Sequence, residues 1–338
     1  MSSGATSFPG IGEGSTKGNI GLDTWSPGCV GLRIQRRPRQ SMSPIPHPLT
    51  PRVAVACGCR LAEEVIWDAR ANALIWVDIE NPAIWRHWPA TNETRRVAVD
   101  EKIGFALLTP NPDVVVAGLK SGVVLLDLVD GRRRPIVKPD PHPQGNRLNS
   151  GNIGPDGALW FGSMDDAEQD DTGSFHRWDG ATLTTFGGKA AVTNGPVVSP
   201  DGSRVYSIDT ARGFVRVHDL DGDRIGTPRT LITFDKSWGH PDGLTLDADA
   251  HLWICHYGGS RITRFTPEGE IERIVPVPTA LVTKCAFGGP NLSTLYITTA
   301  LRDRDPTIDP MAGHLFMVET DFSGFPGNVF EASRRGVP

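Results

Sequence analysis

A few polar side chains interrupt otherwise apolar segments of this chain, and their types and positions would let them do chemistry. Glu63 and Glu64 fall inside the apolar run at residues 61–67. A carboxylate in such a run is costly unless it is paired or bound to a metal ion. Further candidates stand next to other apolar runs, namely Arg147, Asn149, Asn194 and Asp242.

Each candidate also has an ordinary structural alternative. Asp242 lies in Pro-Asp-Gly, a common turn sequence, and Asn194 lies in Asn-Gly, a strong hairpin signal. Their equivalent placement, ahead of strands in successive repeat units, is what favours function. His240 and His256 flank the same region, where either could shuttle protons or could serve as a hydrogen-bonded structural histidine.

The elements that must position these residues form a repeat. Short apolar strand signals recur about 40 to 47 residues apart, several of them after turns such as Pro-Asp-Gly. A period of this length with several strands per unit is typical of a β-propeller. We therefore predict an all-β, six-bladed propeller whose inner strand ends converge on one axial site. The six signals are residues 73–78, 114–118, 158–162, 204–209, 251–256 and 294–298.

Composition excludes several classes of function. The chain has 338 residues, 38 Gly, 28 Pro and a formal net charge of −5, which suits a turn-rich β protein and argues against nucleic-acid binding. No segment approaches the roughly 18 apolar residues of a membrane span, and no secretory signal is evident. Five cysteines without a CxxC pair favour free thiols. We expect a cytoplasmic protein, a monomer or weak oligomer, with neither membrane nor nucleic acid as partner.

Residues 1–50 differ from everything that follows. They are rich in Gly, Ser and Pro and lack β-alternation, so they cannot bury enough apolar surface to offset their ordering entropy. We predict a disordered extension there, with Met42 as a possible true start. Residues 51–338 are predicted to form the propeller, with the strand at 53–56 pairing with the strand at 313–318 to close the ring.

A series of short motifs runs in one order from about Leu61 to Arg304. They are Leu61-Ala62-Glu63, Val65-Ile66-Trp67, Trp76-Val77-Asp78-Ile79, Arg147-Leu148-Asn149, Pro155-Asp156-Gly157, Thr193-Asn194-Gly195-Pro196, Pro241-Asp242-Gly243, Tyr257-Gly258-Gly259, Val282-Thr283-Lys284 and Phe287-Gly288-Gly289-Pro290. In these motifs the chain resembles the senescence marker protein/regucalcin/gluconolactonase family of six-bladed propellers. The phrases around Asn194 and Lys284 are most similar to bacterial sugar lactonases, particularly xylonolactonases.

This resemblance implies one divalent metal ion in the axial funnel. Its ligands would be Glu63, Asn194 and Asp242, and Arg147 and Asn149 would contact the substrate. Two carboxylates neutralise a dication, and an amide oxygen adds a third hard ligand. Such a set accepts Ca²⁺, Mg²⁺, Mn²⁺, Zn²⁺ or Fe²⁺, so the identity of the metal stays open.

The chain departs from the family pattern at a few positions. The family usually has Gly and then Pro after the metal Glu, whereas Glu64 and Val65 follow here. Glu64 could compete as a ligand, although strand alternation points it away from the Glu63 side. Ser150 replaces a usual Asp beside the substrate Asn. The acidic run at residues 165–171 covers a loop where relatives often carry a substrate-contacting acid, with a solvated loop as the alternative.

The resemblance and the residues together favour metal-dependent hydrolysis of a sugar 1,4- or 1,5-lactone to its aldonic acid. The metal would polarise the carbonyl and activate water, and Asp242 is the expected general base. Xylono-, arabinono- and gluconolactone are all open as substrates. The main alternative is a regucalcin-like, calcium-binding regulatory protein without lactone turnover. An interaction propeller and hydrolysis of organophosphate or aryl esters at the same metal are the others.

Overall fold

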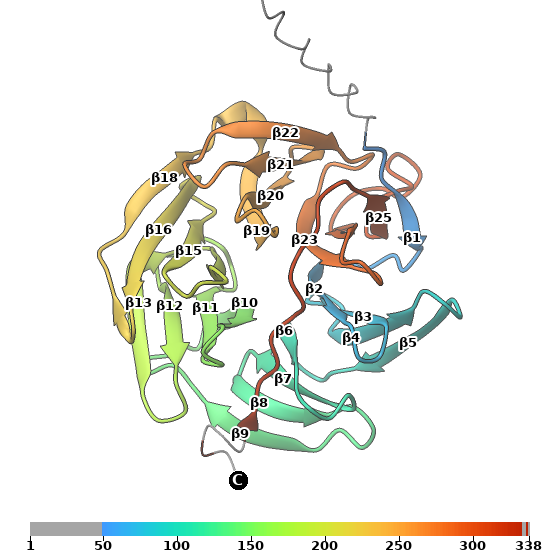
Figure 1. The fold of residues 1–338 in the computed structure, drawn as a ribbon. Helices are drawn as coiled ribbons and strands as arrows, with labels where there is room; N and C mark the ends of the chain where they lie inside the picture. Colours follow the sequence, from blue (N-terminus) through green and yellow to red (C-terminus); the bar gives the residue numbers. More distant parts are fainter. Residues whose placement is uncertain (1–48, 333–335, 337–338) are drawn as a thin grey trace, which may run out of the picture. The chain divides into compact units, whose positions relative to one another are not determined.

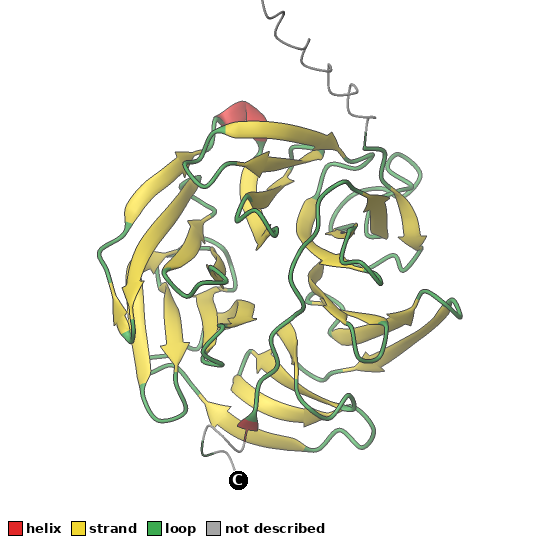
Figure 2. Cartoon of the chain, viewed as in Figure 1, coloured by secondary structure: helices red, strands yellow, loops and turns green. Residues whose placement is uncertain are grey.

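The structure, a computed structural model, describes residues 49–332 and 336 and shows six β-sheets in them. The sheets are arranged as blades around one axis (Figure 1), which confirms the predicted all-β, six-bladed propeller. The labelled helical element is a 3-10 turn, η1 (Lys236–Trp238), the larger red segment in Figure 2, and no helix in the described residues could cross a membrane. Except for Leu49 and Thr50, the predicted extension at residues 1–50 and the start at Met42 lie outside the described residues.

Within each blade, the strands follow one another outward from the axis. Blade 1 is β2 (Ala62–Asp68), β3 (Ala73–Asp78), β4 (Ala83–Trp88) and β5 (Glu93–Ala98). Blade 2 is β6 (Ile103–Leu108), β7 (Val114–Leu119), β8 (Gly122–Asp127) and β9 (Arg133–Val137). Blade 3 is β10 (Asn146–Ile153), β11 (Leu159–Asp165), β12 (Gly173–Trp178) and β13 (Leu183–Ala190).

The second half of the ring has the same plan. Blade 4 is β14 (Thr193–Val198), β15 (Arg204–Asp209), β16 (Phe214–Asp221), β17 (Arg224–Ile225) and β18 (Arg229–Thr233). Blade 5 is β19 (His240–Leu246), β20 (Leu252–Tyr257), β21 (Arg261–Phe265) and β22 (Ile271–Pro276). Blade 6 is β23 (Val282–Gly288), β24 (Thr294–Thr299), β25 (Leu315–Glu319) and, outermost, β1 (Arg52–Val55).

The six strand signals of the sequence correspond to the second strand of each blade. These strands are buried along almost their whole length because both of their faces pack against neighbouring blades. Burial on both faces gives a continuous apolar run rather than alternation, which is why they stand out in the sequence. The outermost strands, such as β5 and β9, are largely exposed.

The ring is closed by strands from the two ends of the described chain. β1 pairs antiparallel with β25, with Arg52 opposite Met317 and Val53 opposite Phe316. The predicted pairing of the first and last strand signals is therefore confirmed. Closure supplies blade 6 with its outermost strand, so that β25 is paired on both of its edges.

Every innermost strand carries one extra residue relative to the second strand, a β-bulge. In β2, for example, Glu63 stands opposite Val77 and Ile66 opposite Ile75. Bulges of this kind leave a residue unpaired and redirect side chains. The others lie at Ile103/Phe105, Leu148/Gly151, Asn194/Val197, Pro241/Leu244 and Val282/Cys285.

After β25 the chain crosses the axis at one end of the propeller. We call residues 320–332 the C-terminal strap, which Figure 1 shows in red passing over the centre of the ring. One end is anchored by Phe322, whose ring lies 5.4 Å from Trp253. The other end is anchored by the buried Phe330, which stacks on Trp178 at 6.0 Å and donates its N–H to Leu108 O at 2.8 Å.

Candidate active site on the propeller axis

The candidate residues all lie on innermost strands and all are buried. Glu63 is on β2, Arg147 and Asn149 are on β10, Asn194 is on β14 and Asp242 is on β19. The sequence placed Glu63 inside a strand, as found, and Asn194 and Asp242 at the heads of strands, whereas both lie within their strands, at or beside the bulges. Each is in the first half of its strand, so they gather at one end of the axis, which we call the site end. The opposite end is the rear end.

Asn194 is held at both ends of its side-chain amide. Its Nδ2 donates to Thr210 Oγ1 at 3.0 Å. Its Oδ1 accepts hydrogen bonds from Ser150 Oγ at 2.8 Å and from Asn149 Nδ2 at 3.3 Å. The amide oxygen is therefore fixed on the side facing β10, and Ser150, one of the departures from the family pattern, helps to fix it.

Arg147 and Asn149 form a preorganised polar pair. Nη1 of Arg147 donates to Asn149 Oδ1 at 2.6 Å, and Asn149 Nδ2 donates to Thr193 O at 2.7 Å. The Arg147 side chain is only 4% exposed, and its Nε lies 3.2 Å from Asp166 Oδ1. Two donor groups thus stand at the site end with little freedom to reorient.

Glu63 and Asp242 are buried carboxylates with few partners. Oε2 of Glu63 accepts a hydrogen bond from the Glu64 N–H at 3.1 Å, and the Asp242 carboxylate makes neither hydrogen bond nor ion pair within the described residues. Burial, with the Glu64 charge, raises the pKa of Glu63 to about 7. Burial, with the Glu63 charge, raises the pKa of Asp242 well above its ordinary range. Buried charges of one sign are unfavourable unless a cation neutralises them.

The side chains of Glu63, Asn194 and Asp242 have the chemistry that suits a divalent cation. Two carboxylates and an amide oxygen are hard oxygen donors, and a dication would compensate the two buried negative charges. No group of three or more His, Cys, Asp and Glu able to hold a metal occurs in residues 49–332. The predicted set, which has two carboxylates and an amide, is of a different kind, and the ligand roles of Glu63, Asn194 and Asp242 stay a prediction.

The direction of Glu64 is set by the bulge of β2 and by an ion pair. Glu64 has a φ of 48°, in the left-handed region, so simple strand alternation is the wrong basis for placing it. Its Oε1 lies 3.2 Å from Nζ of Lys284 on β23, and both side chains are buried. The pair is separated by 220 positions in the chain, and sequence reasoning had no signal for it.

One member of the acidic run is a central part of the site end. Asp166 accepts hydrogen bonds from Lys102 Nζ at 2.8 Å and Lys120 Nζ at 2.9 Å, and it lies beside Arg147. Its side chain is 18% exposed, so the solvated-loop alternative is wrong for this residue. The acidic composition of the loop was visible in the sequence, but the two lysines, on another blade, were not.

A second ion pair joins loops from opposite blades. Glu168 follows β11 of blade 3, Arg302 follows β24 of blade 6, and Arg302 Nη2 lies 2.6 Å from Glu168 Oε1. The charges of both residues act on the pKa of Asp242, so the pair lies close to the candidate carboxylates. The guanidinium of Arg302 also lies 5.8 Å from the ring centre of Tyr257. Sequence reasoning missed Arg302.

The two histidines near the site differ in environment. His240 is exposed. His256 is fully buried, with Nδ1 2.9 Å from Trp238 O and its ring 4.6 Å from that of Phe234. Burial lowers the pKa of His256 to about 4, so the ring is neutral at pH 7. This environment supports the structural alternative for His256.

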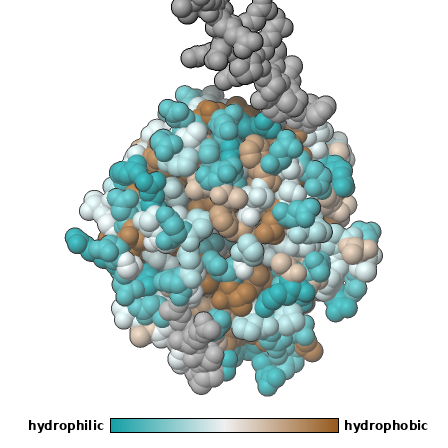
Figure 3. Space-filling view, in the orientation of Figure 1, coloured by the Kyte–Doolittle hydropathy of each residue, from teal (hydrophilic) through white to brown (hydrophobic). Residues whose placement is uncertain are grey.

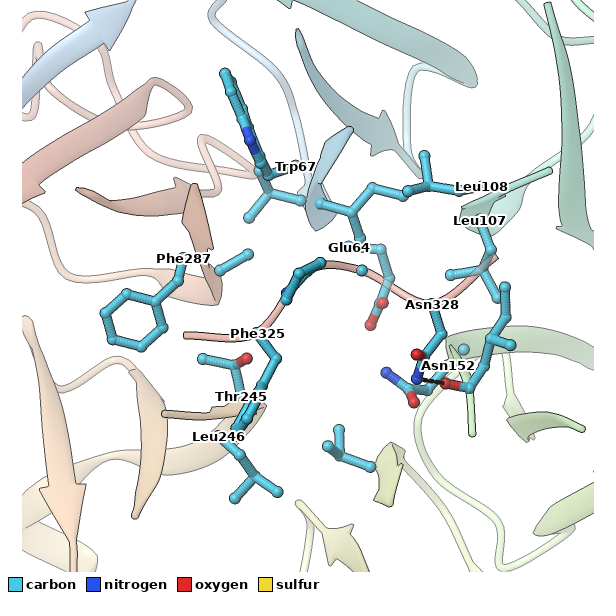
Figure 4. A pocket seen from close by; sticks show the side chains of 18 of the residues that line it. Glu64, Trp67, Leu107, Leu108, Asn152, Thr245, Leu246, Phe287, Phe325 and Asn328 are labelled. Carbon is cyan, nitrogen blue, oxygen red and sulfur yellow. Dashed lines mark hydrogen bonds between the residues drawn. The ribbon is translucent and has the colours of Figure 1, made fainter. Parts of the chain in front are cut away.

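A separate cavity of about 440 Å³ opens at the rear end, beneath the C-terminal strap. Figure 3 shows apolar residues near the centre of this face, and Figure 4 shows Trp67, Leu107, Leu246 and Phe287 around the cavity with Glu64 at its centre. Nδ2 of Asn328, on the strap, donates to Ile153 O at 2.7 Å. None of the five predicted site residues lines this cavity.

Comparison with known proteins identifies the protein family. The family model described as SMP-30/gluconolactonase/LRE-like region matches residues 61–301. The chain belongs to this family. It is 32% identical over 284 residues to the L-arabinolactonase of Azospirillum brasilense, covering 82% of this chain and 94% of that protein. It is 29% identical to the 6-deoxy-6-sulfogluconolactonase of Pseudomonas putida, covering 80% and 94%.

Solved structures of the family share the fold. The crystal structure of a calcium-binding protein, regucalcin, from Agrobacterium tumefaciens superposes with a TM-score of 0.79 at 24% identity. The match covers 84% of this chain and 98% of that one. The six-bladed architecture is thus that of the family.

Proposed function

We propose that this protein hydrolyses a sugar 1,4- or 1,5-lactone to its aldonic acid with the help of one divalent cation. The observation that carries the proposal is the pair of buried, scarcely partnered carboxylates, Glu63 and Asp242, at the same end of the axis as the Arg147–Asn149 pair. The sugar lactonases among the relatives support the same reaction class.

Substrate binding is assigned to Arg147 and Asn149. Their mutual hydrogen bond and the anchoring of Asn149 on Thr193 O hold both groups in place before a ligand arrives. Preorganised donors of this kind can orient sugar hydroxyls and lower the entropic part of the barrier. Asp166 restrains the Arg147 guanidinium on its other side, with Oδ1 3.2 Å from Arg147 Nε.

Proton transfer is assigned to Asp242. A cation held by Glu63, Asn194 and Asp242 would supply Lewis-acid polarisation of the lactone carbonyl. The Asp242 carboxylate takes a proton from the attacking water. As the bond between the carbonyl carbon and the ring oxygen breaks, Asp242 passes the proton taken from water to the ring oxygen, which becomes a hydroxyl of the aldonic acid.

The alternative that a specific comparison favours is a calcium-binding protein without lactone turnover, because the Agrobacterium structure is of a calcium-binding regucalcin. The buried Arg147–Asn149 pair argues against it, because a simple ion sensor has no use for a preorganised sugar-binding group.

A pH-indicator assay on metal-stripped protein tests the proposal. D-xylono-, L-arabinono- and D-gluconolactone are each offered with Fe²⁺, Zn²⁺, Mn²⁺, Mg²⁺ and Ca²⁺ added back. We expect turnover above the spontaneous rate only when a metal is present. Tight Ca²⁺ binding with no turnover of any lactone would instead establish the binding protein.

The variant Asp242→Ala tests the role of the proposed base. We expect kcat to fall by about 10² to 10⁴ or more, because the variant loses both the base and a ligand. Circular dichroism and the thermal midpoint should show an intact fold. A variant with normal kcat at saturating metal would remove Asp242 from the mechanism.

A further inference from the structure

The ion pair between Lys284 and Glu64 occupies the axis directly beneath the candidate site. Lys284 Nζ lies 3.2 Å from Glu64 Oε1, and the two side chains are 7% and 2% exposed. Buried ion pairs add little to stability because desolvation offsets most of their attraction. Because the Glu64–Lys284 pair is buried next to Glu63, we look for a role for it other than stability.

Glu64 is linked directly to the candidate ligand Glu63. Its backbone N–H donates to Glu63 Oε2 at 3.1 Å, from a left-handed conformation with φ of 48°. A non-glycine residue in that region is strained and is held there by its surroundings. The contact with Lys284 is the side-chain interaction that holds Glu64, so it also fixes the N–H that orients Glu63.

Lys284 also touches the strand that carries Asp242. Its side chain and the Thr283 carbonyl lie against Gly243, the residue after Asp242, where a Cβ would stand only 2.8 Å from Thr283 O. Glycine at this position leaves room for the lysine stem, because a Cβ there would stand 2.4 Å from Lys284 Cδ. Lys284 is therefore in contact with both strands that supply the candidate carboxylates.

Three acidic side chains, Glu63, Glu64 and Asp242, lie on neighbouring innermost strands, and Lys284 forms an ion pair with Glu64 alone. Glu63 and Asp242 are therefore the two carboxylates without an ion-pair partner in the described residues. Glu64 stands next in sequence to Glu63 and, without Lys284, would be a third carboxylate free to turn toward a bound cation. Figure 4 shows the Glu64 carboxylate pointing into the space at the rear end.

We propose that Lys284 is a positioning residue that holds Glu64 away from the metal centre, leaving Glu63 as the single ligand from β2. This inference rests on the proposed metal-dependent function. It assigns the Glu64–Lys284 pair the task of setting both the net charge and the number of carboxylate ligands of the centre.

The test measures the affinity of metal-stripped full-length protein for Mn²⁺ alone, by isothermal titration calorimetry, with Ca²⁺ as a second probe. Glu64→Gln leaves an unpaired cation beside the centre, and we expect binding at least about tenfold weaker. Lys284→Met frees the Glu64 carboxylate, and we expect binding at least about tenfold tighter. The double variant should return to within about threefold of the wild type.

The opposite signs separate positioning from a merely structural role, which would weaken binding in both single variants. Equal losses in both, or a double variant that does not recover, would overturn the inference. If Lys284→Met fails to fold, the inference is tested by the other two variants. Mn²⁺ affinity should fall in Glu64→Gln and recover in the double variant. A wild type that binds neither ion overturns the inference together with the metal centre. A wild type that binds Mn²⁺ with the expected pattern but turns over no lactone overturns only the proposed reaction.

Discussion

At the scale of single residues, the site end is organised around carboxylates that the protein interior disfavours. Glu63 has one hydrogen bond, from a backbone N–H, and Asp242 makes none in the described part of the chain. Asp166, by contrast, is held by Lys102 and Lys120. Buried carboxylates without partners lower the stability of the fold. A ligand that binds them should therefore stabilise the protein, because it supplies the missing partner.

Replacing Glu63 with Gln should make the metal-free protein more stable above neutral pH. The pKa of Glu63 is raised from 4.5 to about 7, so between these values the folded state binds more protons than the unfolded one. Stability from this group is therefore lost as pH rises through that window. At pH 8 we expect Glu63→Gln to gain on the order of 3 kcal/mol, and near pH 4.5 to gain almost nothing.

Urea denaturation in the presence of a chelator, from pH 4.5 to 8, measures this difference. The exposed Glu268→Gln is the control and should follow the wild type at every pH. A gain for Glu63→Gln that does not change with pH would mean that the charge of Glu63 is not what strains the fold.

At the scale of elements, the bulges of the innermost strands determine which side chains reach the axis. The bulge between Pro241 and Leu244 contains Asp242 and Gly243. Gly243 packs against the Thr283 carbonyl and the backbone of Lys284, so two neighbouring bulges fit into one another. The position of Asp242 thus depends on close backbone contact between β19 and β23.

Gly243→Ala should therefore disturb the site through the backbone. A Cβ there would stand 2.8 Å from Thr283 O and 3.0 Å from Lys284 Cα, so the strands must move apart. We expect a loss of about 1 to 3 kcal/mol in unfolding free energy and at least a tenfold loss in kcat. Gly145→Ala, where the nearest atom is 3.8 Å away, is the control for both measurements. Unchanged kcat in Gly243→Ala would show that Asp242 does not depend on this contact.

The bulges also mark the limit of what sequence reasoning could reach. The period of the second strands predicted six blades, because strands buried on both faces are apolar throughout. Glu63, Asn194 and Asp242 were identifiable as polar residues near strand heads. The bulges arise from packing around the axis, which no local pattern reports, so the direction of Glu64 could not be derived. Its partner Lys284, 220 positions away, becomes a neighbour only when blade 6 meets blade 1.

At the scale of the whole molecule, the two ends of the axis are built differently. The site end carries Asp166 with its lysine and arginine partners, whereas the rear end is a largely apolar cavity that contains the Glu64–Lys284 ion pair and is crossed by the C-terminal strap. The strap is anchored at Phe322 and Phe330, on either side of the axis. Its contribution should therefore be to stability and not to the chemistry at the other end.

Phe330→Ala separates these two roles. Phe330 is fully buried on Trp178, so we expect a loss of about 3 to 5 kcal/mol in unfolding free energy. Phe325, in the middle of the strap, is 41% exposed, and Phe325→Ala should cost less than about 1 kcal/mol. Both variants should keep the wild-type kcat, measured well below their unfolding temperatures. A large loss of kcat in Phe330→Ala would show that the strap acts on the site.

The closure of blade 6 by β1 and β25 has a consequence for how the protein is made. β1 is synthesised near the start of the described chain, but its partner β25 leaves the ribosome only after all the other strands. During translation β1 and β24 each have an unpaired edge until β25 is made, and such edges can pair with other chains. A nascent chain that stalls before Leu315 would therefore hold five complete blades and still lack a closed ring, which makes the synthesis of β25 the step at which chaperone protection matters most.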